Sequence, residues 1–209
     1  MPPPADASPF ASVLSPIGAQ LASPLHDQYL LSPLDHHRVR LTGQMHKIWH
    51  RPRWIRPLLV LLSWWSILVP ETGTNVPADM LVAVGYDRRG RPCQVWERCF
   101  AFGRRRRRFT SVMVYDARRR TVVERLGPGG LIQVPWRMRI MATGGLRIDV
   151  EGLWLGRFRL PRAISADVIA IEQALDARTV QIELVVNHRL LGPVFGYEGR
   201  FQADREPLS

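Results

Sequence analysis

From Ala78 onward, apolar residues recur at every second position in short segments separated by glycine and proline. Successive side chains of a β-strand point to opposite faces, so this rhythm predicts strands with one buried face. The last third, residues 144–203, shows the pattern with turn signals at Gly144-Gly145, Leu160-Pro161 and Gly192-Pro193. Because short connections make consecutive strands neighbours in space, the sequence predicts an antiparallel meander.

The pattern contains about ten such segments, and a sheet of this size has to curl, split or close. We therefore predict a mostly-β protein whose antiparallel meander forms a curved sheet or barrel, with a two-layer β-sandwich as the alternative. One apolar helix is expected near residues 57–68, because Pro57 suits a first helical turn and the following residues are apolar nearly all round. The segment Pro70–Pro77 carries turn signals and is predicted to be a loop.

The chain has 209 residues, enough for one domain. Residues 1–25 are rich in proline, alanine and serine and are predicted to be a disordered tail. Residues 26–205 are expected to form a single β-rich domain, and residues 206–209 a short second tail. The 46% of hydrophobic residues suffice for a core, and the 17 prolines and 16 glycines suit a fold with many turns.

The formal net charge is +11, from 29 basic and 18 acidic residues. Such a charge favours weak association with polyanions or an anionic membrane. Five consecutive arginines, Arg104–Arg108, are expected in a solvated hairpin turn. No aromatic-interleaved RNA-binding pattern accompanies them, so we expect no specific nucleic-acid binding.

The expected compartment is the cytoplasm, with attachment to the inner membrane surface as an alternative. Prolines interrupt residues 1–22, which lack the pattern of a signal peptide, and the apolar stretch 57–70 is too short for a spanning helix. Cys93 and Cys99 would lie roughly 20 Å apart in one strand, too far for a disulfide.

Arg98 is the first candidate for a binding site. Alternation places it on the same strand face as Trp96 and Phe100, which is normally the inward face. A buried guanidinium needs a carboxylate or carbonyl partner, and Glu124 and Glu172 are candidates. It could anchor the acidic end of a ligand at the floor of a pocket. The alternatives are a structural ion pair, or an exposed face that happens to be aromatic.

Further candidates extend this site. Tyr197, like Glu172, could supply hydrogen bonds to a ligand. Trp54, Trp64 and Trp65 flank or belong to the apolar helix and are expected to contact a membrane or to form a lid. The large apolar residues exceed what a filled small barrel needs, which predicts a cavity for a lipid-like small molecule.

No catalytic set is recognisable, so the sequence leaves open whether the protein is an enzyme. No metal site is expected, because His46 and His50 lie on a predicted strand, where such a spacing separates them by about 13 Å. The absence of G-x-G-x-x-G after a strand argues against a dinucleotide cofactor, and no other cofactor is indicated.

Several motifs in a fixed order resemble one bacterial family, the domain of unknown function 4166. They span residues 26–201 and include Pro70–Pro77, Trp96–Phe100, Phe109–Ser111, Glu124–Gly127, Gly144–Leu146, Leu160-Pro161, Leu190–Pro193 and Tyr197–Gly199. Relatives occur alone or fused behind a reductase of saccharopine-dehydrogenase or short-chain type. The resemblance therefore implies a separately encoded NAD(P)-dependent reductase as an alternative partner, and it implies no catalytic residues.

The sequence thus predicts a domain that binds a hydrophobic or lipid-like small molecule inside a β-barrel. Two alternatives remain, namely an accessory subunit of a reductase and a peripheral membrane or interaction module.

Overall fold

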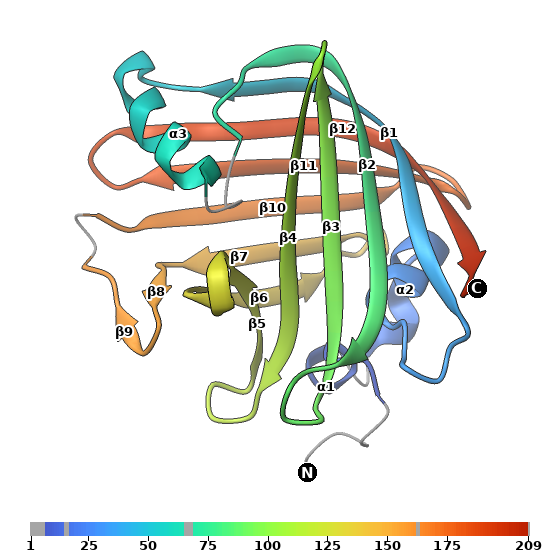
Figure 1. Cartoon of the computed structure of the whole chain (residues 1–209). Helices are drawn as coiled ribbons and strands as arrows, with labels where there is room; N and C mark the ends of the chain where they lie inside the picture. Colours follow the sequence, from blue (N-terminus) through green and yellow to red (C-terminus); the bar gives the residue numbers. More distant parts are fainter. Residues whose placement is uncertain (1–6, 15–16, 65–68, 162–163, 209) are drawn as a thin grey trace.

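Ten strands follow one another around a closed antiparallel barrel (Figure 1). The computed structural model describes residues 7–14, 17–64, 69–161 and 164–208. The ring order is β1-β2-β3-β4-β5-β6-β7-β10-β11-β12, and β12 pairs with β1 to close it. The strands are β1 His37–His50, β2 Gly73–Tyr86, β3 Pro92–Phe102, β4 Arg105–Asp116, β5 Thr121–Leu126, β6 Ile132–Ile140, β7 Leu146–Glu151, β10 Ala166–Ala174, β11 Thr179–His188 and β12 Gly192–Pro207.

Two further strands, β8 (Trp154–Leu155) and β9 (Phe158–Arg159), form a small hairpin attached to β6. The predicted antiparallel barrel is confirmed. The two-layer sandwich is wrong, because the pairing of the first strand with the last leaves the ten-stranded ring without a break. A closed ring also removes the free strand edges that would otherwise expose unpaired backbone groups.

Helices lie at both ends of the barrel (Figure 1). α1 (Ala11–Leu14), η1 (Ile17–Gln20) and α2 (Ser23–Tyr29) lie at one end, and η2 (Arg53–Ile55) and α3 (Arg56–Trp64) at the other. A single turn, η3 (Pro128–Gly130), precedes β6. α3 confirms the predicted apolar helix as far as Trp64, and residues 65–68 of that prediction lie outside the described residues. Among the helices that the structure describes, none is long and apolar enough to cross a membrane.

The prediction of a disordered tail over residues 1–25 fails for the part that the structure describes. Phe10, Leu14 and Leu25 are fully buried in the same core cluster as the barrel strands. The Gln94 side chain, also fully buried, donates hydrogen bonds to Ser8 Oγ at 3.3 Å and to a main-chain carbonyl of α2 at 3.1 Å. The composition of the segment predicts disorder, because the segment can bury little apolar surface by itself. In the folded protein it packs against the apolar end of the barrel, which buries its large side chains. Residues 1–6 lie outside the described residues.

A β-bulge changes which face of β1 points inward. The register of β1 on β12 shifts between Met45 and Lys47, which leaves His46 as the extra residue. A bulge inverts the alternation beyond it. Ile48 is therefore buried, whereas Trp49, which unbroken alternation would place on the same face as Met45, is only half-buried.

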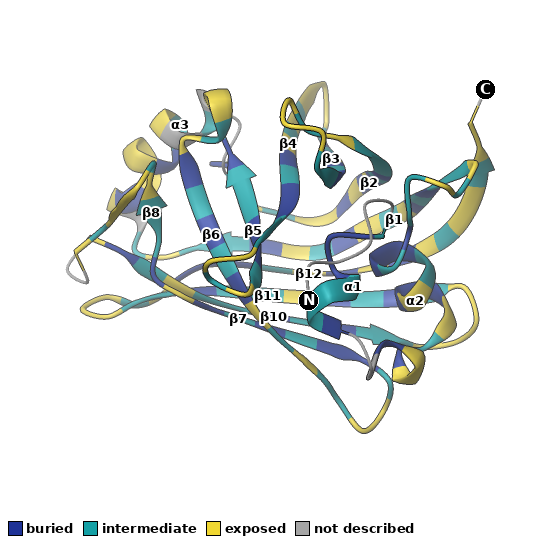
Figure 2. Cartoon of the chain, turned by 90° about the horizontal axis from the view of Figure 1, so that it is seen from below, coloured by how far each residue is buried: buried dark blue, intermediate teal, exposed yellow. Residues whose placement is uncertain are grey.

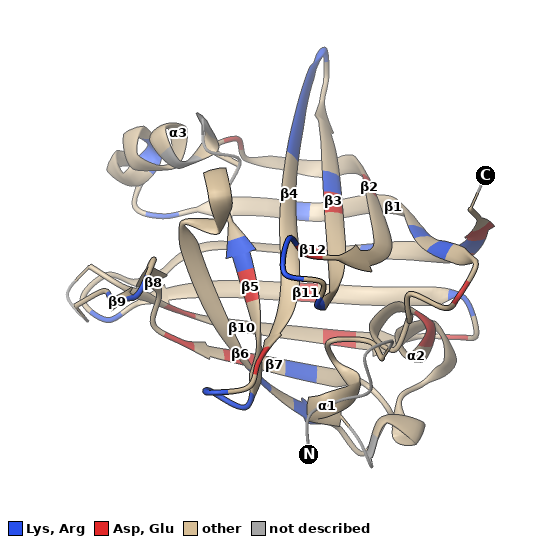
Figure 3. Ribbon diagram, turned by 60° about the horizontal axis from the view of Figure 1, so that its bottom comes forward, with Lys and Arg blue, Asp and Glu red and all other residues tan. Residues whose placement is uncertain are grey.

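Three element boundaries also differ from the prediction. Five of the eight residues of the expected loop Pro70–Pro77 belong to β2, because β1 offers a long edge with which they pair. Only Gly103-Arg104 turn the chain in the arginine run, and the remaining arginines lie on β4, part of which is blue in Figure 3. Arg107 of this strand forms a 2.6 Å ion pair with Glu71. The second tail is shorter than predicted, since β12 continues to Pro207.

Most of the buried apolar residues form one cluster, to which the barrel strands and the N-terminal segment both contribute (Figure 2). Cys93, Val114 and Val123 form a second, small cluster. Cys93 and Cys99 both lie on β3 and are free thiols, as the strand spacing predicted.

Candidate functional site

The barrel interior contains a cavity of about 300 Å³. Nine of the ten barrel strands and α3 contribute to its predominantly apolar wall. Leu58 and Ile164 line it and are also 51% and 65% exposed, so the cavity opens at the end that carries α3, the mouth end. At the opposite, closed end, the rings of Phe10 and Tyr29 pack against each other and against Trp96.

Arg98 lies on the cavity wall and is only 6% exposed, as the alternation of β3 predicted. Its Nη1 donates a hydrogen bond to Ser111 Oγ at 2.9 Å and lies 3.5 Å from Glu124 Oε1. The guanidinium also lies over the rings of Trp96 and Phe109, with Cζ 5.0 and 4.8 Å from their centroids. Its Nε is buried and has no hydrogen-bond partner among the described residues. A buried donor without a partner destabilises the protein, so a ligand oxygen that accepts a hydrogen bond from this nitrogen would bind favourably.

The two predicted carboxylate partners have different roles. Glu124 forms the ion pair with Arg98, and its Oε2 accepts a hydrogen bond from Trp136 Nε1 at 3.3 Å. Glu172 also lines the cavity and is 4% exposed, but it forms no hydrogen bond with Arg98. Its Oε2 instead accepts a hydrogen bond from Gln28 Nε2 at 3.4 Å. The cavity floor therefore holds one cation and two carboxyl groups.

Burial controls the protonation of this floor. Desolvation raises the pKa of Glu172 to about 7, and the opposing effects of nearby hydrogen-bond donors and Arg98 offset it only in part. Desolvation also raises the pKa of Tyr197 to about 12 and the pKa of Tyr29 well above its ordinary value. The tyrosines therefore stay neutral and can donate hydrogen bonds, whereas Glu172 changes its charge near neutral pH.

We predict that Glu172→Gln changes the pH dependence of stability. Because the folded-state pKa is raised, the contribution of Glu172 is fully present below about pH 4.5 and is lost as the pH rises through about 7. The wild-type protein should therefore lose up to about 3 kcal/mol relative to the variant between those limits. Urea unfolding of both proteins at several pH values measures the difference. A difference that stays constant across this range would contradict the burial of an ionisable group here.

The structure brings only some of the predicted residues to the cavity. Tyr197 lines its wall together with Trp96, whereas Phe100 is buried in the core without lining the cavity and stacks on Phe109 with ring centroids 5.9 Å apart. Trp54 is 68% exposed at the mouth end. The side chain of Trp64 and the whole of Trp65 lie outside the described residues.

Sequence reasoning missed several residues of the site. Gln28 belongs to the segment between the predicted tail and the first strand, and nothing local connects it to Glu172, 144 positions away. Phe109 and Trp136 carried a usable signal, because each occupies an alternating position of a predicted strand. The alternation identifies an inward residue, but it does not identify the residue it will face.

The arrangement can bind and orient a molecule and can hold a proton on Glu172. Among the described residues, no group of three or more metal-ligating side chains is close enough to hold a metal ion.

Comparison with known proteins supports the resemblance seen in the sequence. The family model described as domain of unknown function (DUF4166) matches residues 21–201. The uncharacterized protein YndH of Bacillus subtilis (strain 168) is 24% identical over 181 residues, which cover 80% of this chain and 84% of that protein. No solved structure matches significantly.

Proposed function

Since the chain belongs to the DUF4166 family, whose description assigns no activity, we propose a function from its own cavity: the barrel binds an apolar small molecule with an oxygen-bearing end group. The observation that carries the proposal is an apolar cavity whose floor holds buried ionisable groups. Ligand sites typically combine a mostly apolar wall with a few convergent polar groups, in volumes from about 300 Å³ upward.

The two ends of the cavity define the orientation of the ligand. Arg98 and Glu172 lie at its polar floor, and Leu58 and Ile164 lie at its mouth. The end group would lie against the free Nε of Arg98, and the apolar part would extend toward α3. Each buried methylene group contributes about 0.8 kcal/mol, so a short alkyl chain suffices for measurable binding even after the entropic cost of association.

The charge of the floor decides between acidic and neutral end groups. The charges of Arg98 and Glu124 offset each other, so ionised Glu172 would repel a ligand carboxylate. Burial keeps Glu172 largely protonated below about pH 7. An acid should therefore bind more tightly as the pH falls from about 7 toward 6. A neutral alcohol of the same length should bind almost equally at these two pH values.

Displacement of the fluorescent apolar acid 1-anilinonaphthalene-8-sulfonate by decanoic acid and by decanol tests the proposal. Ala170 lines the cavity on the same face of β10 as Glu172. Ala170→Leu should weaken binding of both compounds by at least about tenfold, because the larger side chain fills the space that the ligand would occupy. The matched control is Ala177→Leu in the exposed β10–β11 turn, which should leave binding unchanged.

Native mass spectrometry of protein purified from cells provides an independent measurement. A retained small molecule that disappears in Ala170→Leu is the expected result. Failure of both compounds to displace the probe, together with protein that carries nothing from cells, would contradict a binding cavity.

The reductase partner remains a prediction of the family resemblance.

A further inference from the structure

The mouth end is surrounded by exposed apolar side chains. Eight of the 13 large apolar residues that are exposed in the described structure lie on η2, α3, the β8–β9 hairpin, the segment before β10 and the β11–β12 turn, although such residues are normally scattered over a protein surface. We call the following six the apolar rim: Trp54, Leu58, Phe158, Ile164, Leu190 and Leu191. Their exposed fractions run from 40% to 74%.

The fold brings these six residues to one end of the barrel. At this end β1 leads into η2 and α3, and His50 of β1 pairs with Phe195 of β12. The β11–β12 turn, residues 189–191, lies beside it, and His188 of β11 pairs with Ala166 at the start of β10. Asp167 of β10 then pairs with Glu151, which leads into the β8–β9 hairpin. α3, the β8–β9 hairpin and the β11–β12 turn lie on the same side of the molecule in Figure 1.

Arginines without ion pairs accompany the apolar rim. Arg51, Arg56, Arg157 and Arg189 are exposed, and within the described residues none of them forms an ion pair. Arg157 instead lies over the ring of Phe158, with Cζ 4.9 Å from the centroid. Positive charge beside exposed aromatic and aliphatic groups is the pattern of an interfacial membrane anchor.

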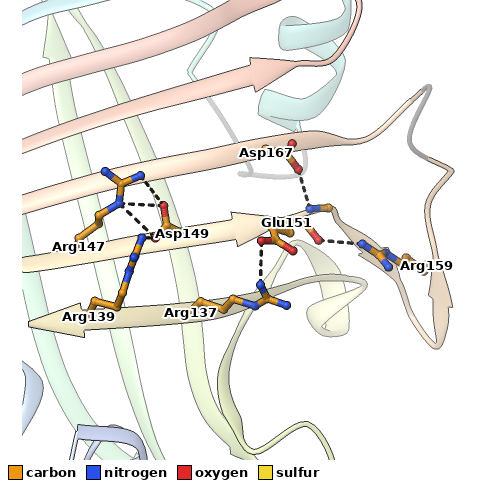
Figure 4. Close-up of polar contacts among 8 residues, drawn as sticks. Arg137, Arg139, Arg147, Asp149, Glu151, Arg159 and Asp167 are labelled. Carbon is orange, nitrogen blue, oxygen red and sulfur yellow. Dashed lines mark hydrogen bonds and ion pairs between the residues drawn. The ribbon is translucent and has the colours of Figure 1, made fainter.

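The adjacent outer face of the barrel provides a contrast (Figure 4). There the acidic residues of β7 neutralise the arginines: Asp149 pairs with Arg139 and Arg147, and Glu151 pairs with Arg137, all at 2.8 Å. The exposed arginines of this face are therefore compensated. The arginines of the mouth end lack this compensation, which leaves them available to an anionic partner.

We propose that the mouth end docks on a membrane surface that contains anionic lipid, with the apolar rim inserted at the headgroup level and the four arginines contacting phosphates. Arginine near an anionic surface strengthens binding about fivefold per residue, and buried rim side chains add to this. The docked orientation points the cavity mouth at the lipid. Docking itself needs no bound ligand. The proposal rests on the proposed function only in that the ligand would enter the cavity from the membrane through this mouth.

Flotation with phosphatidylcholine vesicles that contain about 30% phosphatidylglycerol tests this docking. The wild-type protein should float with these vesicles, should not float with pure phosphatidylcholine, and should be released by about 0.5 M NaCl. β11 offers a matched pair of variants, because its two ends carry similar turns. Arg189→Glu/Leu190→Ser changes the mouth end, and Arg178→Glu/Leu175→Ser changes the exposed turn at the closed end.

The first double variant should reduce the fraction of floating protein at least about tenfold, and the second less than about twofold. Equal loss in both variants would overturn the proposal, because it would indicate a general charge effect. Flotation with neutral vesicles alone would overturn it too, as would binding of a DNA duplex through the same arginines without vesicle binding.

The same variants separate this proposal from the binding cavity. Neither pair lines the cavity, so displacement of the fluorescent probe in the absence of vesicles should be unchanged in both. Probe binding without flotation would reject membrane docking alone. Flotation without probe binding would reject the ligand cavity alone.

Discussion

Arg98→Met should lower the free energy of unfolding by about 3–5 kcal/mol, the usual cost of removing one partner of a buried ion pair. Methionine retains the apolar stem but leaves the Glu124 carboxylate in the cavity wall with only the Trp136 indole hydrogen bond. The Ser111 hydroxyl also loses its 2.9 Å contact with Nη1. Urea unfolding at neutral pH measures the effect.

The double variant Arg98→Met/Glu124→Gln is the control, because it removes both charges of the pair. It should recover most of the lost stability, since an uncharged pair of similar volume is often as stable as a buried ion pair. Losses that simply add would contradict the coupling of the two residues. A single-variant effect below about 1 kcal/mol would show that the guanidinium is solvated rather than buried.

The double variant also separates binding from folding. If Arg98 anchors the end group, the folded double variant should bind decanoic acid at least about tenfold more weakly than the wild-type protein. The affinity for decanol should fall less, because an alcohol makes a weaker hydrogen bond to the guanidinium. Equal affinity of the two proteins for decanoic acid would remove Arg98 from the ligand site and leave it with a structural role.

Phe10→Ala should destabilise the protein by about 3–5 kcal/mol, although Phe10 lies in a segment whose composition suggests disorder. Its side chain is fully buried, and its ring centroid lies 5.0 Å from that of Tyr29 and 5.8 Å from that of Trp136. Removing the ring leaves a cavity at the closed end of the barrel and weakens the support of Tyr29. Thermal and urea unfolding measure the loss.

Phe158→Ala is the matched control, because Phe158 is 65% exposed in the β8–β9 hairpin. It should change stability by less than about 0.5 kcal/mol. If both phenylalanines behave alike, residues 7–14 do not pack as the structure shows, and the closed end of the barrel would instead be open.

The family match agrees with this structural picture without adding a function to it. The matched residues, 21–201, include α2 and all ten barrel strands except part of β12. α1 and Phe10 lie before them. The segment that closes the barrel is therefore partly outside the region matched by the family model, which makes the Phe10→Ala result informative about this chain in particular.

Much of the site could be read from the sequence because alternation is a local property. The two-residue rhythm placed Trp96 and Arg98 on one inward face, and the apolar run after Pro57 predicted α3. Alternation alone does not identify the inward residues of β1, because a bulge at His46 inverts the pattern. Whether a strand contains a bulge depends on its partners, which its own residues do not specify.

The sequence alone determined that the chain forms an antiparallel meander, that Trp96 and Arg98 of β3 point inward and where the apolar helix begins. Only the tertiary structure decided that β12 closes on β1, that the N-terminal segment fills one end of the barrel, and that Glu124 rather than Glu172 pairs with Arg98. The physical reason is the distance along the chain over which each interaction acts. Strand and helix preferences act between near neighbours, whereas closure, burial and the pKa of a carboxyl depend on residues that only folding brings together.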